Sequence, residues 1–269
     1  MIFAAGLGTR LKPLTDTVPK ALIPVSGQPL LYHVIMKLKA AGVEEIIINV
    51  HHFAGLIKEY LHANSNFGLK ISISDETSFL RDTGGGIRYA KSLLLANNAD
   101  PASDFFIVHN VDIVSNLDLR SFELSTKAGS LATLLVSKRV TQRYFLFDDS
   151  MKLVGWTNVS TGEVKSPYVN IDPGSCRRFA FGGIHMISDS IFDVFDKIDS
   201  SPSEFPLYDR DGKVMAGSDV SFGEKFSIVD FYLRAAAKYD VFGNAPDGLR
   251  LIDVGKVDTL SQVESSGLV

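Results

Sequence analysis

Met1-Ile2-Phe3-Ala4-Ala5-Gly6-Leu7-Gly8-Thr9-Arg10 joins an apolar segment to a glycine loop. The apolar residues predict a buried strand, and the glycines end it. Two glycines let the backbone bend and approach a ligand closely, and their N–H groups form an anion-binding concavity. Arg10 adds a planar, permanently charged donor, and Lys20 adds a point charge if the loop folds back. The stretch predicts a phosphate-binding loop; a tight turn without a ligand is the alternative.

This loop matches neither of the two common nucleotide-binding patterns. A dinucleotide fingerprint needs a third glycine where Leu11 stands, and an acidic residue where the second strand ends in Asn49-Val50-His51. A Walker-type loop needs Gly-Lys-Ser/Thr after four intervening residues, and that sequence is missing here. The chemistry therefore points to phosphate binding of another kind.

The first 110 residues alternate short strands and helices. Apolar periodicity predicts helices at 30–41, 54–62 and 87–96, the last after a Gly84-Gly85-Gly86 turn, and strands at 45–50, 69–74 and 104–109. This order predicts a Rossmann-like, doubly wound α/β fold with a mixed, mainly parallel sheet in three α/β/α layers. The loops that begin at Gly6, Asp75 and Asn110 follow strand ends and should converge at one edge.

The second half of the chain is less regular. Segments 131–137, 144–147, 153–157 and 179–186 predict strands of a more antiparallel region, and a late strand is expected at 249–253. Helices are expected at 191–198 and 228–238, and a polar, mobile loop at 160–175. Because no linker, low-complexity tract or repeat interrupts the sequence, residues 1–269 are expected to form one domain.

Composition narrows the class of partner. The chain has 45% hydrophobic residues and a net charge of −4, with 27 basic and 31 acidic residues. A nucleic-acid partner is not expected, because the basic footprint that such binders carry is missing. Cys176 is the only cysteine, so an intramolecular disulfide cannot form, as in a reducing compartment. No apolar run approaches the roughly 20 residues that span a bilayer, and the apolar start is too short for a secretory signal. We therefore expect a cytoplasmic protein without a membrane partner.

Two aspartates stand where strands are expected to end, Asp112 and Asp253. Mg²⁺ prefers one or two carboxylates, completed by water and substrate phosphates. Only the fold can bring residues so far apart in sequence together beside the phosphate loop. The alternative is that each is a turn residue that ends a strand, a common position for Asp.

The glycine loop, followed by Leu14-Thr15, Pro19-Lys20 and Pro24-Val25, resembles the signature of the sugar-phosphate nucleotidyltransferases, or NDP-sugar pyrophosphorylases. The resemblance extends over nearly the whole chain and is weakest at about 137–178. The compact chain and the segments 82–86 and 251–255 are most similar to the N-acetylmuramate 1-phosphate uridylyltransferases, with mannose-1-phosphate guanylyltransferases as near neighbours.

The resemblance implies a set of roles for residues of this chain. Residues 1–130 would form the nucleotide-binding half and 131–269 the sugar-phosphate-binding half. It implies catalytic Arg10, Lys20, Asp112 and Asp253, with both aspartates on Mg²⁺; nucleotide binding by Ala5, Gly6, Gly8, Thr9, Glu76, Thr83, Gly84 and Gly85, with Glu76 at the base edge and the glycines against the base and ribose; and sugar binding by Gly183.

Two departures from the family pattern concern the local geometry. Val111 precedes the first aspartate where the family usually has glycine, so a side chain there could narrow the site. The Glu-Lys-Pro segment that supplies a lysine for the sugar phosphate is also missing. Lys165, Arg177 and Arg178 are the candidates to replace it, or they are solvated loop charges.

The reaction expected from the resemblance joins an NTP to a sugar 1-phosphate and releases pyrophosphate, with UTP and N-acetylmuramate 1-phosphate as the first substrates and GTP with mannose 1-phosphate as the alternative. A nucleotide-sugar-dependent glycosyltransferase normally carries Asp-x-Asp, where this chain has Asn110-Val111-Asp112. A non-catalytic sugar-nucleotide-binding module would be expected to have lost one of Arg10, Lys20 or the two aspartates. The sequence does not indicate an oligomeric state.

Overall fold

The computed structural model describes residues 1–96 and 104–269. Its α-helices are α1 (Leu30–Ala40), α2 (Ala54–Ala63), α3 (Asp82–Tyr89), α4 (Lys91–Ala96), α5 (Leu119–Leu124), α6 (Ile191–Ser200), α7 (Ile228–Ala235) and α8 (Val257–Ser266). Its strands are β1 (Ile2–Phe3), β2 (Pro24–Val25), β3 (Gln28–Pro29), β4 (Glu45–Val50), β5 (Lys70–Asp75), β6 (Phe105–Asn110), β7 (Ile113–Ser115), β8 (Ala132–Ser137), β9 (Arg143–Phe147), β10 (Leu153–Asn158), β11 (Glu163–Lys165), β12 (Arg177–Ser188), β13 (Val241–Asn244) and β14 (Leu251–Asp253). Short 3-10 helices are η1 (Thr9–Leu11), η2 (Leu14–Asp16), η3 (Lys20–Leu22), η4 (Ser65–Gly68) and η5 (Pro202–Glu204).

The first strands form the parallel part of a ten-stranded sheet, in the order β6-β1-β4-β5. β1 pairs in parallel with β4 on one edge and with β6 on the other. The chain therefore moves outward from β1 through β4 to β5 and then returns to the far side of β1. From β1 the chain crosses over toward β4, whereas after β6 it continues on the opposite side of the sheet. The strand order therefore reverses between β1 and β6, and ligands of such sheets bind at this switch point, beyond the carboxyl ends of the strands.

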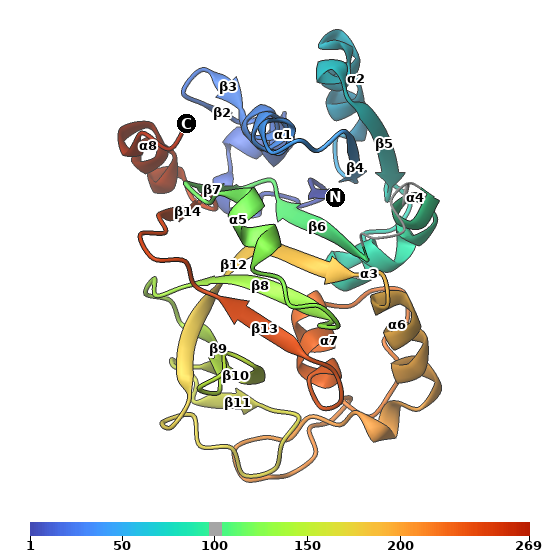
Figure 1. The fold of residues 1–269 in the computed structure, drawn as a ribbon. Coiled ribbons are helices and arrows are strands. Elements are labelled where there is room, and N and C mark those ends of the chain that lie inside the picture. The colour runs from blue at the N-terminus through green and yellow to red at the C-terminus, as the bar shows by residue number, and fades with distance from the viewer. Residues whose placement is uncertain (97–103) are drawn as a thin grey trace.

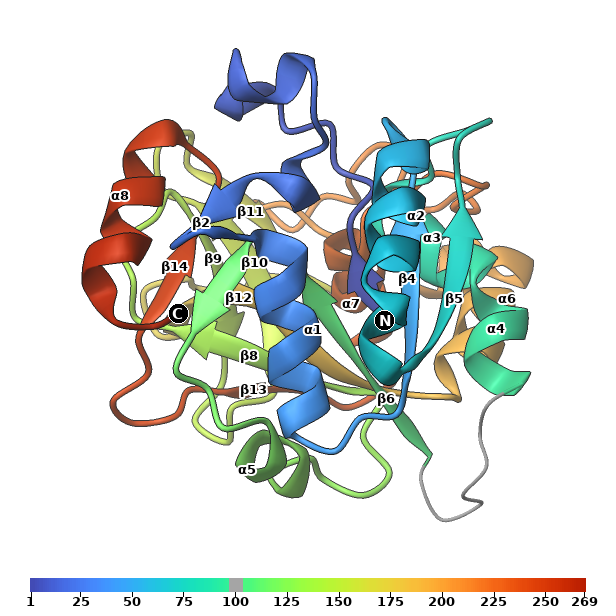
Figure 2. The same ribbon diagram turned by 90° about the horizontal axis from the view of Figure 1, so that it is seen from above.

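Helices cover both faces of this sheet, which confirms the predicted three-layer α/β fold. Figure 2 looks onto one face and shows α1 and α2 in front of the strands, with α6 and α7 behind them. Each layer has its own hydrophobic core. One core contains Val34 of α1 and Ile57 of α2, and the other contains Ile87 of α3 and Phe231 of α7, all fully buried or nearly so.

The second half adds antiparallel strands to the same sheet, as the sequence indicates (Figure 1). The long strand β12 is the centre of this region, because it pairs antiparallel with β6, β8 and β9. β13 then pairs in parallel with β8. A separate two-stranded sheet forms between β7 and β14, in which Asp253 lies opposite Ile113. This late pairing brings Asp253 to the switch point.

Two details differ from the sequence-based expectations. Gly84, Gly85 and Gly86 lie inside α3 and are not a turn before a helix. The segment 160–175 is not a continuous loop, because β11 pairs with β10 within it. The irregular stretch after the glycine loop contains η2, η3 and the β2–β3 hairpin. None of the described helices is long and apolar enough to cross a bilayer.

Candidate active site

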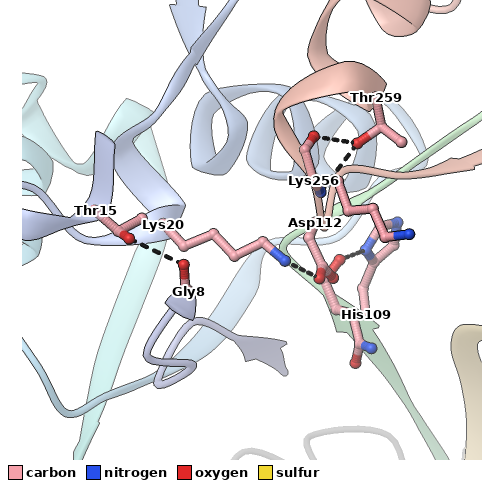
Figure 3. A network of polar contacts seen from close by, with 8 residues as sticks. Gly8, Thr15, Lys20, His109, Asp112, Lys256 and Thr259 are labelled. Atoms are coloured by element: carbon pink, nitrogen blue, oxygen red, sulfur yellow. Dashed lines mark hydrogen bonds and ion pairs between the residues drawn. The ribbon is translucent and has the colours of Figure 1, made fainter. Parts of the chain in front are cut away.

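The glycine loop folds back over the residues that follow it. Gly8 has a left-handed φ of 64°, and a Cβ on it would lie 2.8 Å from Cγ2 of Thr15 and 3.1 Å from Cβ of Lys20. The hydroxyl of Thr15 donates to the carbonyl of Gly8 at 2.9 Å (Figure 3). Glycine is favoured here because it adopts the left-handed conformation without strain and permits this close approach. The fold-back places Lys20 directly under the loop.

Lys20 reaches from the loop to the end of β6. Its side chain is almost buried, and its ammonium forms an ion pair with Oδ2 of Asp112, as Figure 3 shows. The pairing connects the first predicted cation to the first predicted metal ligand. Val111, beside this aspartate, is 5% exposed and belongs to the hydrophobic core on the α1 side, and it also lines the cleft described below.

The second aspartate lies next to the first. The backbone N–H of Val254 donates to the carbonyl of Asp112 at 2.8 Å, which continues the β7–β14 pairing. Burial, and then the negative charge of Asp112, raise the pKa of Asp253. Oδ1 of Asp253 is buried and has no hydrogen-bond partner among the described residues. A buried anionic oxygen of this kind is costly unless something neutralises it.

The donor set fits Mg²⁺. Two adjacent carboxylates, one with an unsatisfied buried oxygen, are what Mg²⁺ uses in proteins when substrate phosphates and water complete its shell. Residues 1–96 and 104–269 contain no group of three or more His, Cys, Asp or Glu side chains suited to a metal. A cage made of protein ligands alone is therefore not built into these parts of the chain.

Gly255 lies between Arg10 and Asp253. A Cβ there would lie 2.8 Å from Nη2 of Arg10 and 2.9 Å from Oδ1 of Asp253. The missing side chain lets the guanidinium from the glycine loop approach the second carboxylate. The four residues predicted to be catalytic, Arg10, Lys20, Asp112 and Asp253, therefore meet at one place.

A buried amide holds the first residues of the glycine loop. Oδ1 of Asn49, on β4, accepts hydrogen bonds from the backbone N–H groups of Ala4 and Ala5 at 2.7 and 3.3 Å. Its Nδ2 donates to Oε1 of Glu76 at 2.9 Å, and the other oxygen of Glu76 accepts from the backbone N–H of Arg81 at 2.9 Å. Glu76 is fully buried and both of its oxygens are engaged with protein groups.

A cleft of about 470 Å³ opens between these groups. It is lined by residues that the sequence predicted for nucleotide binding or catalysis, namely Ala5, Gly6, Gly8, Thr9, Arg10, Lys20, Glu76, Thr83 and Asp112. The loops that follow β1, β5 and β6 thus converge as expected. Asn49, Asn110, Val111, Lys225 and Gly255 also line the cleft.

Gly84 and Gly85 differ from the expectation that they face a base and ribose, because neither lines the cleft. A Cβ on Gly84 would lie 2.3 Å from the ring of Phe226, and a Cβ on Gly85 would lie 2.3 Å from the carbonyl oxygen of Glu224. Both glycines are needed because α3 packs closely against the segment before α7. Thr83 does line the cleft, and its hydroxyl accepts from the N–H of Ile228 at 3.0 Å.

A second compartment of about 780 Å³ adjoins the first, and Arg10, Asn110 and Gly255 line both. Asp253 and Gly183 lie in its wall, and Gly183 has a left-handed φ of 69° where β12 changes register. Three more cations line it, Arg139, Arg143 and Lys256, together with the aromatic rings of Phe145, Trp156 and Phe181.

The three basic residues considered for the sugar phosphate lie outside both compartments. Lys165 forms an ion pair with Asp230 at 3.1 Å, and its ammonium lies 5.4 Å from the ring centroid of Trp156. Nε of Arg178 donates to the carbonyl of Pro173, and Arg177 lies over the ring of Phe179. None of them lines the space described above.

Sequence reasoning missed several residues of this site. Asn49 had a readable signal, since it is a polar residue near the end of the apolar run Ile46-Ile47-Ile48. Arg139 and Arg143 had none, because solvated loop charges have the same appearance in a sequence. Lys256 directly follows the predicted Asp253-Val254-Gly255 segment, and that position was its only signal.

Comparison with known proteins adds an independent finding. A family model described as nucleotidyl transferase matches residues 1–144. N-acetylmuramate alpha-1-phosphate uridylyltransferase of Caulobacter vibrioides is 49% identical over 96 residues, which are 35% of this chain and 40% of that protein. The enzyme of the same name from Neisseria meningitidis is 40% identical over 118 residues, 44% of this chain and 48% of its own length. Mannose-1-phosphate guanylyltransferase 1 of Arabidopsis thaliana is 32% identical over 140 residues, 51% of this chain and 37% of that protein. The matched part thus spans less than half of each relative.

Solved structures resemble the whole chain at low identity. HddC from Yersinia pseudotuberculosis, in a complex with GMP-PN, superposes with a TM-score of 0.66 at 20% identity, over 98% of this chain and 97% of that one. UDP-glucose pyrophosphorylase in a complex with UDP-glucose gives a TM-score of 0.69 at 14% identity, over 98% and 96%. At such identities the likeness shows the fold alone.

Proposed function

Because the chain belongs to the nucleotidyl transferase family, we propose that it transfers the nucleotidyl group of an NTP to a sugar 1-phosphate and releases pyrophosphate. The observation that carries the proposal is the meeting of Asp112 and Asp253 beside the glycine loop, with Oδ1 of Asp253 buried and unsatisfied within the described structure. A metal ion bound together with a triphosphate would supply the positive charge that this buried oxygen lacks.

In the proposed reaction an oxygen of the sugar 1-phosphate attacks the α-phosphorus of the NTP. The new O–P bond forms as the bond between the α-phosphorus and its bridging oxygen breaks, and the electron pair leaves with pyrophosphate. The nucleophile is already an anion, so no protein base has to remove a proton. Catalysis then depends on positioning and on neutralising charge.

Different residues of the chain would have different roles in this reaction. The N–H groups of the glycine loop and Arg10 would bind the triphosphate, and Lys20 would neutralise charge at the phosphates. Asp112 and Asp253 would hold Mg²⁺, which when bound supplies positive charge at the α-phosphate oxygens. Asn49 would keep the start of the loop in its binding conformation through Ala4 and Ala5.

For the substrates, we propose UTP and N-acetylmuramate 1-phosphate. The proposal is supported by the two uridylyltransferase relatives, which are 49% and 40% identical over the matched residues. GTP with mannose 1-phosphate is the second candidate, and it is favoured by the match to the Arabidopsis guanylyltransferase over 51% of the chain.

The test is a matrix of pyrophosphate release, with UTP, GTP, dTTP and CTP against the 1-phosphates of N-acetylmuramate, N-acetylglucosamine, glucose and mannose, in Mg²⁺. Asp112→Ala should lower turnover by about 10²–10³, the usual cost of one electrostatic contact in a transition state. Asp149→Asn, which changes an exposed carboxylate outside both compartments, is the control.

Each rival activity has its own signature in this assay. A glycosyltransferase would consume a nucleotide sugar and release nucleoside diphosphate. A non-catalytic module would bind nucleotide and sugar phosphate tightly with no turnover of any pair. Full turnover by Asp112→Ala would contradict the role of that carboxylate even if pyrophosphate is released.

A further inference from the structure

The second compartment has an excess of positive charge. Arg139, Arg143 and Lys256 line it, and Asp253 is the one carboxylate among the described residues of its wall. All three cations are exposed, and none of them forms an ion pair with any residue in 1–96 or 104–269. Cations that converge on a concave wall without acidic partners attract anionic ligands.

Lys165 provides a contrast within the same region. It lies opposite Trp156 in the β10–β11 pairing, on the same face of the strands as that ring, and its charge is compensated by Asp230 at 3.1 Å. Arg139 and Arg143 lie on or beside the same antiparallel strands, but neither forms an ion pair with any described residue.

The cations occupy different walls. Arg139 lies close enough to Asp253 for their opposite charges to interact, and its Nη2 donates to the carbonyl of Phe181 at 3.1 Å. Arg143 begins β9, opposite Asn158 of β10. Figure 1 shows β14, which carries Asp253, in the upper half of the view and β9 and β10 in the lower half.

The pleat of the strands fixes what Arg143 faces. Residues two apart on a strand share a face, so Arg143 and Phe145 point the same way, and Trp156 lies opposite Phe145 on the neighbouring strand. All three side chains line the compartment. Arg143 is thus the cation at the outer edge of an aromatic wall that suits the apolar face of a sugar ring.

We propose that the sugar 1-phosphate carries a second anionic group, and that Arg143 binds it. The inference rests on the proposed function, which requires the 1-phosphate to reach Asp112 and Asp253 and therefore to lie on the side of Arg10 and Arg139. One anionic group does not account for a further guanidinium beyond Trp156. A carboxylate and a second phosphate share the planar, bidentate chemistry that Arg recognises, and the experiment distinguishes them.

The test compares acceptors that differ in the second anion. N-acetylmuramate 1-phosphate is compared with N-acetylglucosamine 1-phosphate, which lacks its lactyl carboxylate, and glucose 1,6-bisphosphate with glucose 1-phosphate. The wild type should have the higher kcat/KM for the anionic member of one pair, and that pair identifies the group. Arg143→Ala should lower kcat/KM for that member roughly 10–100-fold more than for its neutral partner, mainly through KM, as expected for loss of a charged hydrogen bond.

Two variants control for general damage. Arg143→Lys keeps the charge and should recover part of the preference. Arg210→Ala changes an exposed arginine that lines neither compartment, and it should leave the preference as in the wild type. A wild type that uses the neutral members equally well would overturn this inference alone, as would an Arg143→Ala enzyme that loses both members equally. Absence of pyrophosphate release with every pair would overturn the proposed function and this inference with it.

Discussion

Asn49 of β4 and Glu76, the residue directly after β5, form a buried hydrogen bond of 2.9 Å, through which Glu76 holds the side chain that fixes the start of the glycine loop. The amide oxygen of Asn49 accepts from Ala4 and Ala5, so its orientation is determined by the bond that its nitrogen makes. Glu76 in turn accepts from the backbone of Arg81, just before α3. One carboxylate thus connects both sides of the 470 Å³ cleft.

Glu76→Gln tests whether this carboxylate positions the loop or reads the base. A glutamine would present an NH₂ group to one of the two N–H donors, at a buried site. This mismatch should lower the free energy of unfolding by about 1–3 kcal/mol. The kcat/KM values with UTP and with GTP should fall in the same proportion. Steady-state kinetics measures the activity, and thermal unfolding measures the stability. Glu59→Gln, on the exposed face of α2, is the matched control. A changed UTP to GTP ratio without loss of stability would assign Glu76 to base recognition instead.

Substitution by alanine should have opposite effects on stability at Gly6 and at Gly8. Gly8→Ala introduces a Cβ at a left-handed φ of 64° and 2.8 Å from Thr15, so the protein should lose about 1–3 kcal/mol of stability. Gly6 has no atom within 4 Å of a Cβ and no positive φ, so Gly6→Ala should fold as well as the wild type. Its added methyl would project into the cleft and weaken NTP binding. Thermal unfolding and nucleotide titration of both variants measure this, and a destabilised Gly6→Ala would contradict the loop geometry.

Lys20→Met should separate metal affinity from turnover. Without the ammonium, Asp112 and Asp253 repel each other with no cation paired to them. Mg²⁺ should then bind the nucleotide-free protein about tenfold more tightly, because a unit charge a few ångströms away contributes on the order of 1–4 kcal/mol. Turnover should nevertheless fall about 10²–10³, since the phosphates lose a cation. Calorimetric Mg²⁺ titration tests the first part, with Lys12→Met as the control on an exposed lysine of the same loop. Weaker Mg²⁺ binding by Lys20→Met would refute the arrangement.

Acid should destabilise the fold through two buried histidines. Burial lowers the pKa of His185 from 6.5 to about 3 and that of His109 to about 4. Below pH 6.5 the unfolded chain therefore binds protons that the folded chain does not, and stability falls as the pH is lowered. Each histidine contributes a slope on the order of 1.4 kcal/mol per pH unit between its two pKa values.

His185→Gln measures one of these contributions. Glutamine keeps a partner for the hydroxyl of Tyr232, which lies 2.6 Å from Nδ1 of His185, but it does not titrate. Denaturant unfolding at pH 4, 5, 6 and 7 should give a shallower dependence on pH than in the wild type, by about one proton. An identical slope in the two proteins would mean that His185 is already protonated in the fold.

The sequence predicted the fold best where one local pattern repeats along the chain. Alternating strands and helices over the first 110 residues predicted the parallel sheet, because buried parallel strands are short apolar runs and their crossover helices carry an amphipathic stripe. The convergence of the loops at Gly6 and Asn110 followed from right-handed crossovers. Both expectations hold in the structure.

The remainder depended on tertiary contacts that no local pattern contains. The sequence predicted that Gly84 and Gly85 contact a base and ribose. In the structure, glycine is necessary there because Phe226 and Glu224 lie too close for a side chain. The cations of the second compartment come from a loop and a strand end that are chemically ordinary in sequence. The sequence placed Asp253 at the end of a strand, and only the β7–β14 pairing shows how it reaches Asp112.

That pairing has a consequence for biosynthesis of the protein. Most of the 470 Å³ cleft is encoded by the first 112 residues, but the second carboxylate arrives on β14, after residue 250. A chain still attached to the ribosome, or shortened by a premature stop codon before that strand, would present the glycine loop and Lys20 to nucleotide without the acid that completes the site. Translation beyond residue 253 is therefore required before the two carboxylates can meet.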